Sequence, residues 1–204
     1  MELTALQQDA LVELLNIGFG RAAASLSQLT GQRVLLEVPR VSVHSVAELT
    51  DTLAPVLGHE VASVHQIFSG AVAGDALLLL DHRAGSMLKE LLTNEPPLPL
   101  SMDATAREVL TEVGNILLNA CLGTFGNILQ VQVSFSVPRL NLDTLHDLMR
   151  SLMINQEGMR YALVVQAAFR LRDAEVSGYL VIVLSVASLD RLIRAVEDWE
   201  HRQS

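Results

Sequence analysis

The strongest constraint on the fold of this chain is that its sequence repeats. The segments 11–17 and 110–116 both contain Glu-x-x-Asn, and the second copy begins 99 residues after the first. At the same spacing, the tripeptide Val-Pro-Arg at 38–40 recurs at 137–139. In each half the Asn is therefore followed, after 22 intervening residues, by a proline. A recurrence of residues together with their spacing predicts an internally duplicated fold.

The later parts of the two halves also correspond. The segment 74–80 resembles 178–184, with an offset of 104 that requires only small loop insertions. A stretch at 94–99 holds three of the six prolines and separates the halves. We therefore predict a single domain, residues 1–204, built of two repeats at about 1–95 and 100–204.

Apolar periodicity and end signals predict the same order of elements in each half. Thr4 and Gln7 are predicted to form a capping box at the start of the first helix, and Gly31 is predicted to end it. We expect an α/β-type (α+β) fold with a mostly antiparallel sheet, shared by two halves related by a pseudo-two-fold axis, with the long helices on its faces. The expected helices lie at about 4–29, 45–56, 82–92, 103–125, 144–155 and 187–199, and the expected strands at about 33–43, 61–69, 75–81, 130–140, 161–171 and 177–185.

Composition excludes several classes of function. Fourteen Lys and Arg against 23 Asp and Glu give a net charge of -9, which argues against nucleic-acid binding. The single lysine, Lys89, follows no glycine-rich loop, and the single cysteine, Cys121, allows neither an internal disulfide nor a thiolate cluster. No secretory signal and no unbroken apolar run of membrane-spanning length are visible, so we expect a soluble cytoplasmic protein.

Each long helix carries a polar stripe. Four residues advance a helix by about 40° and seven by about -20°, so Asp9, Glu13 and Asn16 lie within a stripe about 60° wide, opposite the apolar face. Glu108, Glu112 and Asn115 repeat the pattern. A solvated helix face is the plain interpretation of one such pair. Asn is a poor helix former, however, and it recurs at the equivalent position beside Glu, which favours a functional role.

The chemistry of this pair is positioning chemistry. A carboxamide donates and accepts hydrogen bonds and can therefore orient a water molecule, whereas a carboxylate can bind a cation on a partner. Neither group is a nucleophile, and neither a Gly-x-Ser-x-Gly elbow nor a metal-ligand spacing of the six histidines is present. The Gly-x-Gly-x-x-Ala at 18–23 lies inside a helical pattern, so it predicts close helix packing and not a dinucleotide loop.

The first copy of the motif resembles a known signature. The pattern Asp/Ser-x3-Glu-x2-Asn-x22-Pro is typical of the CheC/CheX/FliY family of response-regulator phosphatases. Asp9, Glu13, Asn16 and Pro39 match it in full, and Asn16 begins an Asn-Ile-Gly-x-Gly-x-Ala-like segment of that family. The likeness covers nearly the whole chain and is closest to the stand-alone CheC type.

The second copy of the motif departs from this signature at one position. Glu112, Asn115 and Pro138 match, but Glu108 stands where the pattern has Asp or Ser. Because the longer carboxylate lies one turn before Glu112, it could compete for a cationic partner or crowd a docking surface, or it could be harmless. We therefore expect the first site to be competent and leave the second open.

The resemblance implies a reaction. Members of the family hydrolyse the phosphoaspartate of the chemotaxis regulator CheY. By resemblance, Asn16 and Asn115 would orient the attacking water, and Glu13 and Glu112 would pair with the regulator's active-site lysine. The chain would need no cofactor of its own, because the metal, normally Mg²⁺, belongs to the regulator. Pro39 and Pro138 would shape a strand more than touch the substrate.

Two non-enzymatic alternatives remain open. The segment 144–155 is an amphipathic helix whose default role is core packing, and in CheC-type proteins the corresponding region is associated with binding the receptor deamidase CheD. The chain could thus be a binding module that regulates CheD, or a motor-switch or signalling adaptor that keeps the fold. The apolar residues that would face CheD are Leu145, Leu148, Met149, Leu152 and Met153.

Overall fold

The computed structural model describes residues 3–70, 72–93, 104–154, 160–171 and 174–203, without the side chains of 39, 154, 160, 171 and 201–203. The proline-rich stretch at 94–99 lies outside these residues. The helices are α1 (Ala5–Thr30), α2 (Leu49–Leu57, after a 3-10 turn at Val46–Glu48), α3 (His82–Thr93), α4 (Ala104–Leu129), α5 (Leu145–Ile154) and α6 (Val186–Gln203). The strands are β1 (Val34–Ser45), β2 (Glu60–Gly70), β3 (Gly74–Asp81), β4 (Val133–Phe135), β5 (Arg139–Thr144), β6 (Arg160–Leu171) and β7 (Ala174–Ser185).

One antiparallel sheet of seven strands organises the molecule, in the order β1-β6-β7-β3-β2-β4, with β5 also on β2. The predicted fold class, helices on a mostly antiparallel sheet, is confirmed. The pairing also exchanges strands between the halves: β1 pairs with β6 of the second half, and β4 and β5 pair with β2 of the first. The edge strand after each Glu-x-x-Asn helix therefore depends on the other half for its register.

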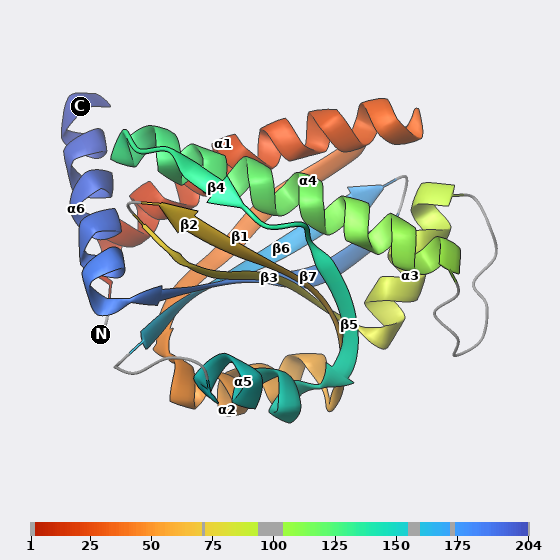
Figure 1. Cartoon of the computed structure of the whole chain (residues 1–204). Coiled ribbons are helices and arrows are strands. Elements are labelled where there is room, and N and C mark those ends of the chain that lie inside the picture. The colour runs from red at the N-terminus through yellow and green to blue at the C-terminus, as the bar shows by residue number, and fades with distance from the viewer. Residues whose placement is uncertain (1–2, 71, 94–103, 155–159, 172–173, 204) are drawn as a thin grey trace.

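The sheet is covered on both faces, as Figure 1 shows. Helices α1 and α4 lie side by side and run in opposite directions on one face, and α2 and α5 lie together on the other. Two apolar clusters fill these layers, one under α1 and α4 and one under α2 and α5. Burial on both faces explains the nearly continuous apolar run of β3.

The first long helix begins and ends where its sequence predicts. The hydroxyl of Thr4 accepts a hydrogen bond from the Gln7 N–H (3.2 Å), and the Gln7 side chain accepts one from the Thr4 N–H (2.9 Å). Gly31 ends the helix with φ 66°, a left-handed conformation in which glycine carries no steric penalty. These two signals fix where α1 begins and ends.

Two predicted elements need correction. The strand expected at 130–140 is two strands, β4 and β5, because the chain leaves the ladder between Phe135 and Arg139. The helix at 45–56 is a 3-10 turn followed by α2, which continues past Pro55 to Leu57. Pro55 lies in the last turn of α2, and because a proline has no N–H this helix lacks the bond that residue 55 would otherwise donate to the carbonyl of Asp51.

Helix α4 is, among the described residues, the one helix long and apolar enough in composition to span a membrane. In the structure, 56% of its apolar window is buried within the protein. Gly114 is the point of closest approach, because a Cβ there would lie 2.5–2.9 Å from the side-chain atoms of Val64 on β2. The apolar composition of α4 is thus that of a core helix lying on a sheet.

Candidate active site

The first polar stripe lies at the surface of α1. Asp9, Glu13 and Asn16 are exposed, and the residues on the opposite side of the helix, among them Leu11 and Leu15, are fully buried. On the core side α1 also meets α4 at Gly18, where a Cβ would lie 3.2 Å from backbone atoms of Ala120 and Cys121. The predicted close helix packing is therefore confirmed at Gly18. Gly20, in contrast, has nothing within 4 Å of an added Cβ.

Asn16 is tied to the strand that carries the motif's proline. The backbone N–H of Val38 donates a hydrogen bond to Asn16 Oδ1 (3.1 Å). Two turns earlier, Gln8 Nε2 donates to the carbonyl of Val41 (2.9 Å), and near the other end of α1 the Val34 N–H donates to Ser27 Oγ (3.0 Å), so three side chains of α1 bond to β1. The spacing of 22 residues between Asn and Pro is the length of chain that leaves α1, turns, and returns along β1 to this contact.

A bulge in β1 releases the backbone N–H of Val38 from the pairing of the sheet. Glu37 pairs with Ala168 and Arg40 with Gln166, so residues 38 and 39 together stand opposite one residue, Ala167. Such a bulge interrupts the ladder hydrogen bonds, and residue 39 is a proline without an N–H. The Val38 N–H can therefore turn to the helix. The side chain of Pro39 lies outside the described residues.

The second site repeats the bulge. Phe135 pairs with Phe68, the N–H of Ser136 donates to the carbonyl of Ile67 (2.9 Å), and pairing resumes with Arg139 opposite His65. Val137 and Pro138 thus stand together opposite Gln66, as residues 38 and 39 stand opposite Ala167. Both halves place Val-Pro in the same two-against-one bulge.

The second Asn has a different anchor. Glu108 and Glu112 are exposed on α4, and Asn115 is half-buried. Asn119 Nδ2, one helical turn further along, donates to Asn115 Oδ1 (2.8 Å). Gln66 Nε2 donates both to Asn119 Oδ1 (3.2 Å) and to the carbonyl of Ser136 (2.9 Å). Asn115 therefore reaches its bulge through two side chains and not through a backbone N–H.

Charge at both sites is unpaired within the described part of the chain. No ion pair to Glu13 or Glu112 occurs there, and no group of three or more metal-binding side chains is found there. The one thiol is not a nucleophile, because burial raises the pKa of Cys121. Glu13 and Glu112 are thus exposed carboxylates that could bind a cationic side chain of a partner.

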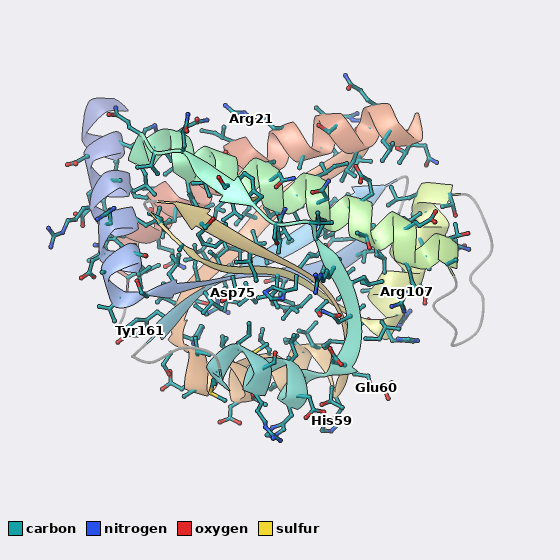
Figure 2. The ribbon with its side chains drawn as sticks, in the orientation of Figure 1. Arg21, His59, Glu60, Asp75, Arg107 and Tyr161 are labelled. Atoms are coloured by element: carbon teal, nitrogen blue, oxygen red, sulfur yellow. The ribbon has the colours of Figure 1, made fainter. Side chains whose placement is uncertain are left out.

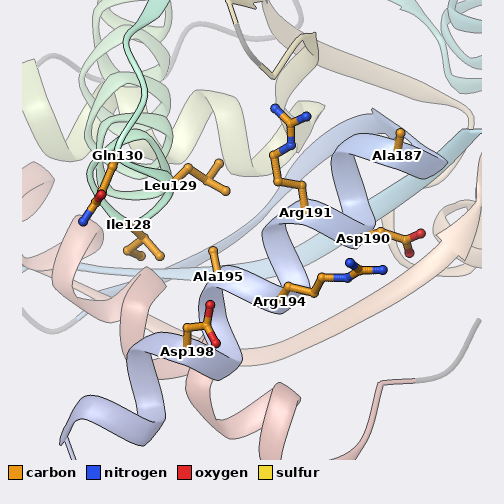
Figure 3. Close-up of a pocket in the computed structure, with 9 residues that line it drawn as sticks. All are labelled: Ile128, Leu129, Gln130, Ala187, Asp190, Arg191, Arg194, Ala195 and Asp198. Atoms are coloured by element: carbon orange, nitrogen blue, oxygen red, sulfur yellow. The ribbon is translucent and has the colours of Figure 1, made fainter.

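Two of the hollows in the protein surface lie along α4. One of about 300 Å³ lies between the ends of α1 and α3 and the first turns of α4, and Glu108 and Glu112 are among its lining residues. A hollow of about 570 Å³ lies between the C-terminal end of α4 and α6 (Figure 3), with Gln130, Arg191 and Arg194 among its lining residues and none of the predicted site residues. The acids of the second site thus border a recess.

Other polar features lie away from these stripes. His65 Nε2 and Asp75 Oδ1 are 3.0 Å apart on β2 and β3, and Asp75 lies on the side of the sheet that faces α2 and α5 (Figure 2). Arg21 on α1 and Arg107 on α4 are exposed. None of these groups joins the Glu and Asn stripes.

The predicted partner helix is mostly core. Four of the five predicted partner-facing residues are 5% exposed or less and pack in the cluster under α2 and α5: Leu145, Leu148, Met149 and Leu152. Met153 alone is exposed, at 48%. The predicted surface is thus corrected to Met153, because the apolar stripe of an amphipathic helix faces the sheet.

Comparison with known proteins gives the family. The model of the CheC-like family matches residues 6–43, the segment from the first stripe through the β1 bulge. The CheY-P phosphatase CheC of Bacillus subtilis (strain 168) is 30% identical over 141 residues, which cover 67% of this chain and 66% of that protein. The chain belongs to the CheC-like family.

Two further comparisons match proteins named FliY. The flagellar motor switch phosphatase FliY of Bacillus subtilis (strain 168) is 22% identical over 148 residues, 69% of this chain but 37% of that protein. The X-ray crystal structure of Thermotoga maritima FliY superposes with a TM-score of 0.77 at 18% identity, covering 97% of this chain and 99% of that one. The alignments thus span two thirds or less of the curated relatives' length, and the structural match establishes the fold.

Sequence reasoning missed three groups that complete the sites: the Val38 N–H, Asn119 and Gln66. Asn119 had a signal, because it continues the stripe one turn after Asn115. The counterpart of Asn119 in the first half is Gly20, so the repeat itself drew no attention to the position. Gln66 had none, since it lies on a strand of the other half.

Proposed function

We propose that this protein hydrolyses the phosphoaspartate of a CheY-like response regulator in chemotaxis signalling. The observation that carries the proposal is the repeated arrangement of an exposed Glu with an Asn whose carbonyl oxygen is already held by the protein. The name of the 30% identical relative, a CheY-P phosphatase, supports the same reaction.

In this reaction a water oxygen attacks the phosphorus while the bond from phosphorus to the aspartate oxygen breaks. Inorganic phosphate leaves, and the aspartate regains its carboxylate. An acyl phosphate is already electrophilic, so the catalyst has to position the water and stabilise charge. A carboxamide held at its oxygen has a fixed plane, and a fixed plane orients a water with little loss of entropy in the transition state.

The polarity of that carboxamide follows from its anchor. The Val38 N–H can only donate, so Asn16 Oδ1 must face it and the amide nitrogen must point the other way. The oxygen retains a second lone pair. Asn16 can thus engage the water or the phosphoryl group with both functions while its orientation is kept.

The acids have the role of docking groups. Glu13 lies one helical turn before Asn16, and Glu112 one turn before Asn115, so each carboxylate would contact the regulator beside the reacting group. A lysine of the regulator is the cation that these exposed acids would bind. Mg²⁺ would be held by the regulator, and no metal step is assigned to this chain.

The test is phosphate release from a CheY-like regulator phosphorylated by a small phosphodonor in Mg²⁺. Substoichiometric amounts of this protein should accelerate release over many turnovers. Protein that has been treated with chelator and desalted should retain full activity when it is added to the Mg²⁺-loaded regulator. A rate equal to the regulator's own decay at every protein concentration would refute the proposal.

Binding of CheD is a second candidate, and the exposure of Met153 is the observation that favours it. Met153→Glu should then weaken a complex with CheD and leave the fold intact, as circular dichroism would show. Met149→Glu is the matched contrast: it buries a charge in the core and should unfold the protein. CheD affinity unchanged by Met153→Glu would remove α5 as the contact.

A further inference from the structure

We propose that Asn119 and Gln66 are positioning residues of the second site, and that together they replace the Val38 N–H of the first. This rests on the proposed function. The relay runs from the carbonyl of Ser136 at the bulge through Gln66 and Asn119 to Asn115, with three hydrogen bonds of 2.9, 3.2 and 2.8 Å.

The burial of Gln66 is the first argument. This side chain is 2% exposed, and its Oε1 accepts no hydrogen bond from the described residues. A buried acceptor without a partner costs about 1–3 kcal/mol. At the same place in the other half stands Ala167, which carries no such cost. Burial of Gln66 at this cost in stability needs an explanation, and a function for the two hydrogen bonds that its amide nitrogen donates supplies one.

The second argument is polarity. The carbonyl of Ser136 only accepts, so the nitrogen of Gln66 must face it, and that nitrogen also serves Asn119 Oδ1. The nitrogen of Asn119 must then face Asn115 Oδ1. The chain of amides thus fixes the orientation of the Asn115 amide, with its oxygen held by Asn119 and its nitrogen pointing away from Asn119. A backbone donor imposes the same outcome on Asn16.

The third argument is that the first site lacks the parts of the relay and does not need them. Gly20 stands where Asn119 stands, and Ala167 where Gln66 stands, so no side chain at either place could reach Asn16. Val38, correspondingly, is 5% exposed and turned inward with its N–H on Asn16, whereas Val137 is 81% exposed. In the first site the Val38 N–H thus takes the place of the missing relay side chains, and in the second site the relay takes the place of a backbone N–H.

The experiment isolates the second site in an Asn16→Ala background. Asn119→Leu keeps the approximate volume and removes the donor, and Gln66→Met keeps the length and removes both donors. Phosphate release from the phosphorylated regulator gives kcat and KM for each variant. We expect kcat to fall by about tenfold or more, with KM within about twofold, because the relay orients Asn115 and does not dock the regulator.

Asn127→Leu is the matched control, since Asn127 is exposed near the end of the same helix and outside the relay. It should leave kcat at the level of the background. Melting temperatures separate folding from chemistry, and Asn119→Leu, at a half-buried helix position, remains informative if Gln66→Met does not fold.

The outcomes are distinct. Activity in the background that is unchanged or raised by both relay variants would overturn the inference and leave the proposed function standing. Activity in wild type but none in Asn16→Ala would also overturn it, because a positioned Asn115 should work alone. No activity in wild type would refute the proposed function itself.

Discussion

The two Glu-x-x-Asn sites differ in how they hold the same amide. In the first, the main chain does it, since the Val38 N–H reaches Asn16 directly. In the second, side chains do it, through Asn119 and Gln66. The shared element is the Val-Pro bulge from which both anchors start. The two halves therefore share the orientation of the Asn amide, whereas the groups that hold this amide differ between them.

Among changes to the residues of one site, the largest expected effect separates docking of the regulator from positioning of the water. Glu13→Arg, measured with Asn115→Ala present, and Glu112→Arg, measured with Asn16→Ala present, should each lower kcat/KM about 100-fold, because a repulsive contact replaces an attractive one at the regulator's lysine. The loss should appear mainly in KM and weaken at high salt.

Asp51→Arg on α2, on the other face of the sheet, makes the same change of charge as a control and should alter kcat/KM little. Glu13→Arg or Glu112→Arg with an unchanged KM would show that these acids do not contact the partner.

The bulges offer a matched pair of valines. Val38→Ala should lower the free energy of unfolding by about 2 kcal/mol, because Val38 is 5% exposed, while the N–H to Asn16 is retained. Val137→Ala should change it by less than about 0.5 kcal/mol, because Val137 is 81% exposed. Urea unfolding of both variants measures this, and equal losses would mean that the two bulges point their valines the same way.

The smallest expected effect concerns the glycines of the two helices. Gly114→Ala should lower the free energy of unfolding by about 1 kcal/mol, since overpacking against Val64 outweighs the gain in helix propensity. Gly20→Ala should raise it by up to about 1 kcal/mol, because nothing lies near the added methyl. Thermal melts of the two variants should therefore shift in opposite directions, and a stabilised Gly114→Ala would contradict the close approach of α4 to β2.

Local signals predicted much of this molecule. The capping box at Thr4, the stop at Gly31 and the apolar faces of the long helices depend on neighbours within a few residues, and the structure has them as expected. The amphipathic segment at 144–155 is likewise the core helix that its pattern indicates by default.

What could not be predicted depends on contacts far apart in the chain. The exchange of edge strands brings Gln66 beside α4, 53 residues from Asn119, and the repeat alone does not show which half pairs with which. The break between β4 and β5 follows from a two-against-one pairing at Val137 and Pro138, and an alternating apolar pattern carries no information on such a register shift.

The central claim is that Asn16 and Asn115 each position the hydrolysis. Phosphate release from one phosphorylated regulator, by wild type, Asn16→Ala, Asn115→Ala and the double variant, tests it most directly. Ala is the better helix former, so the exposed Asn16→Ala should not cost helix stability, although it loses the bond to Val38. The account predicts that each single variant retains part of the activity and that the double variant falls about 100-fold or more, towards the regulator's own decay. Full activity in the double variant, with binding to the regulator preserved, would contradict it.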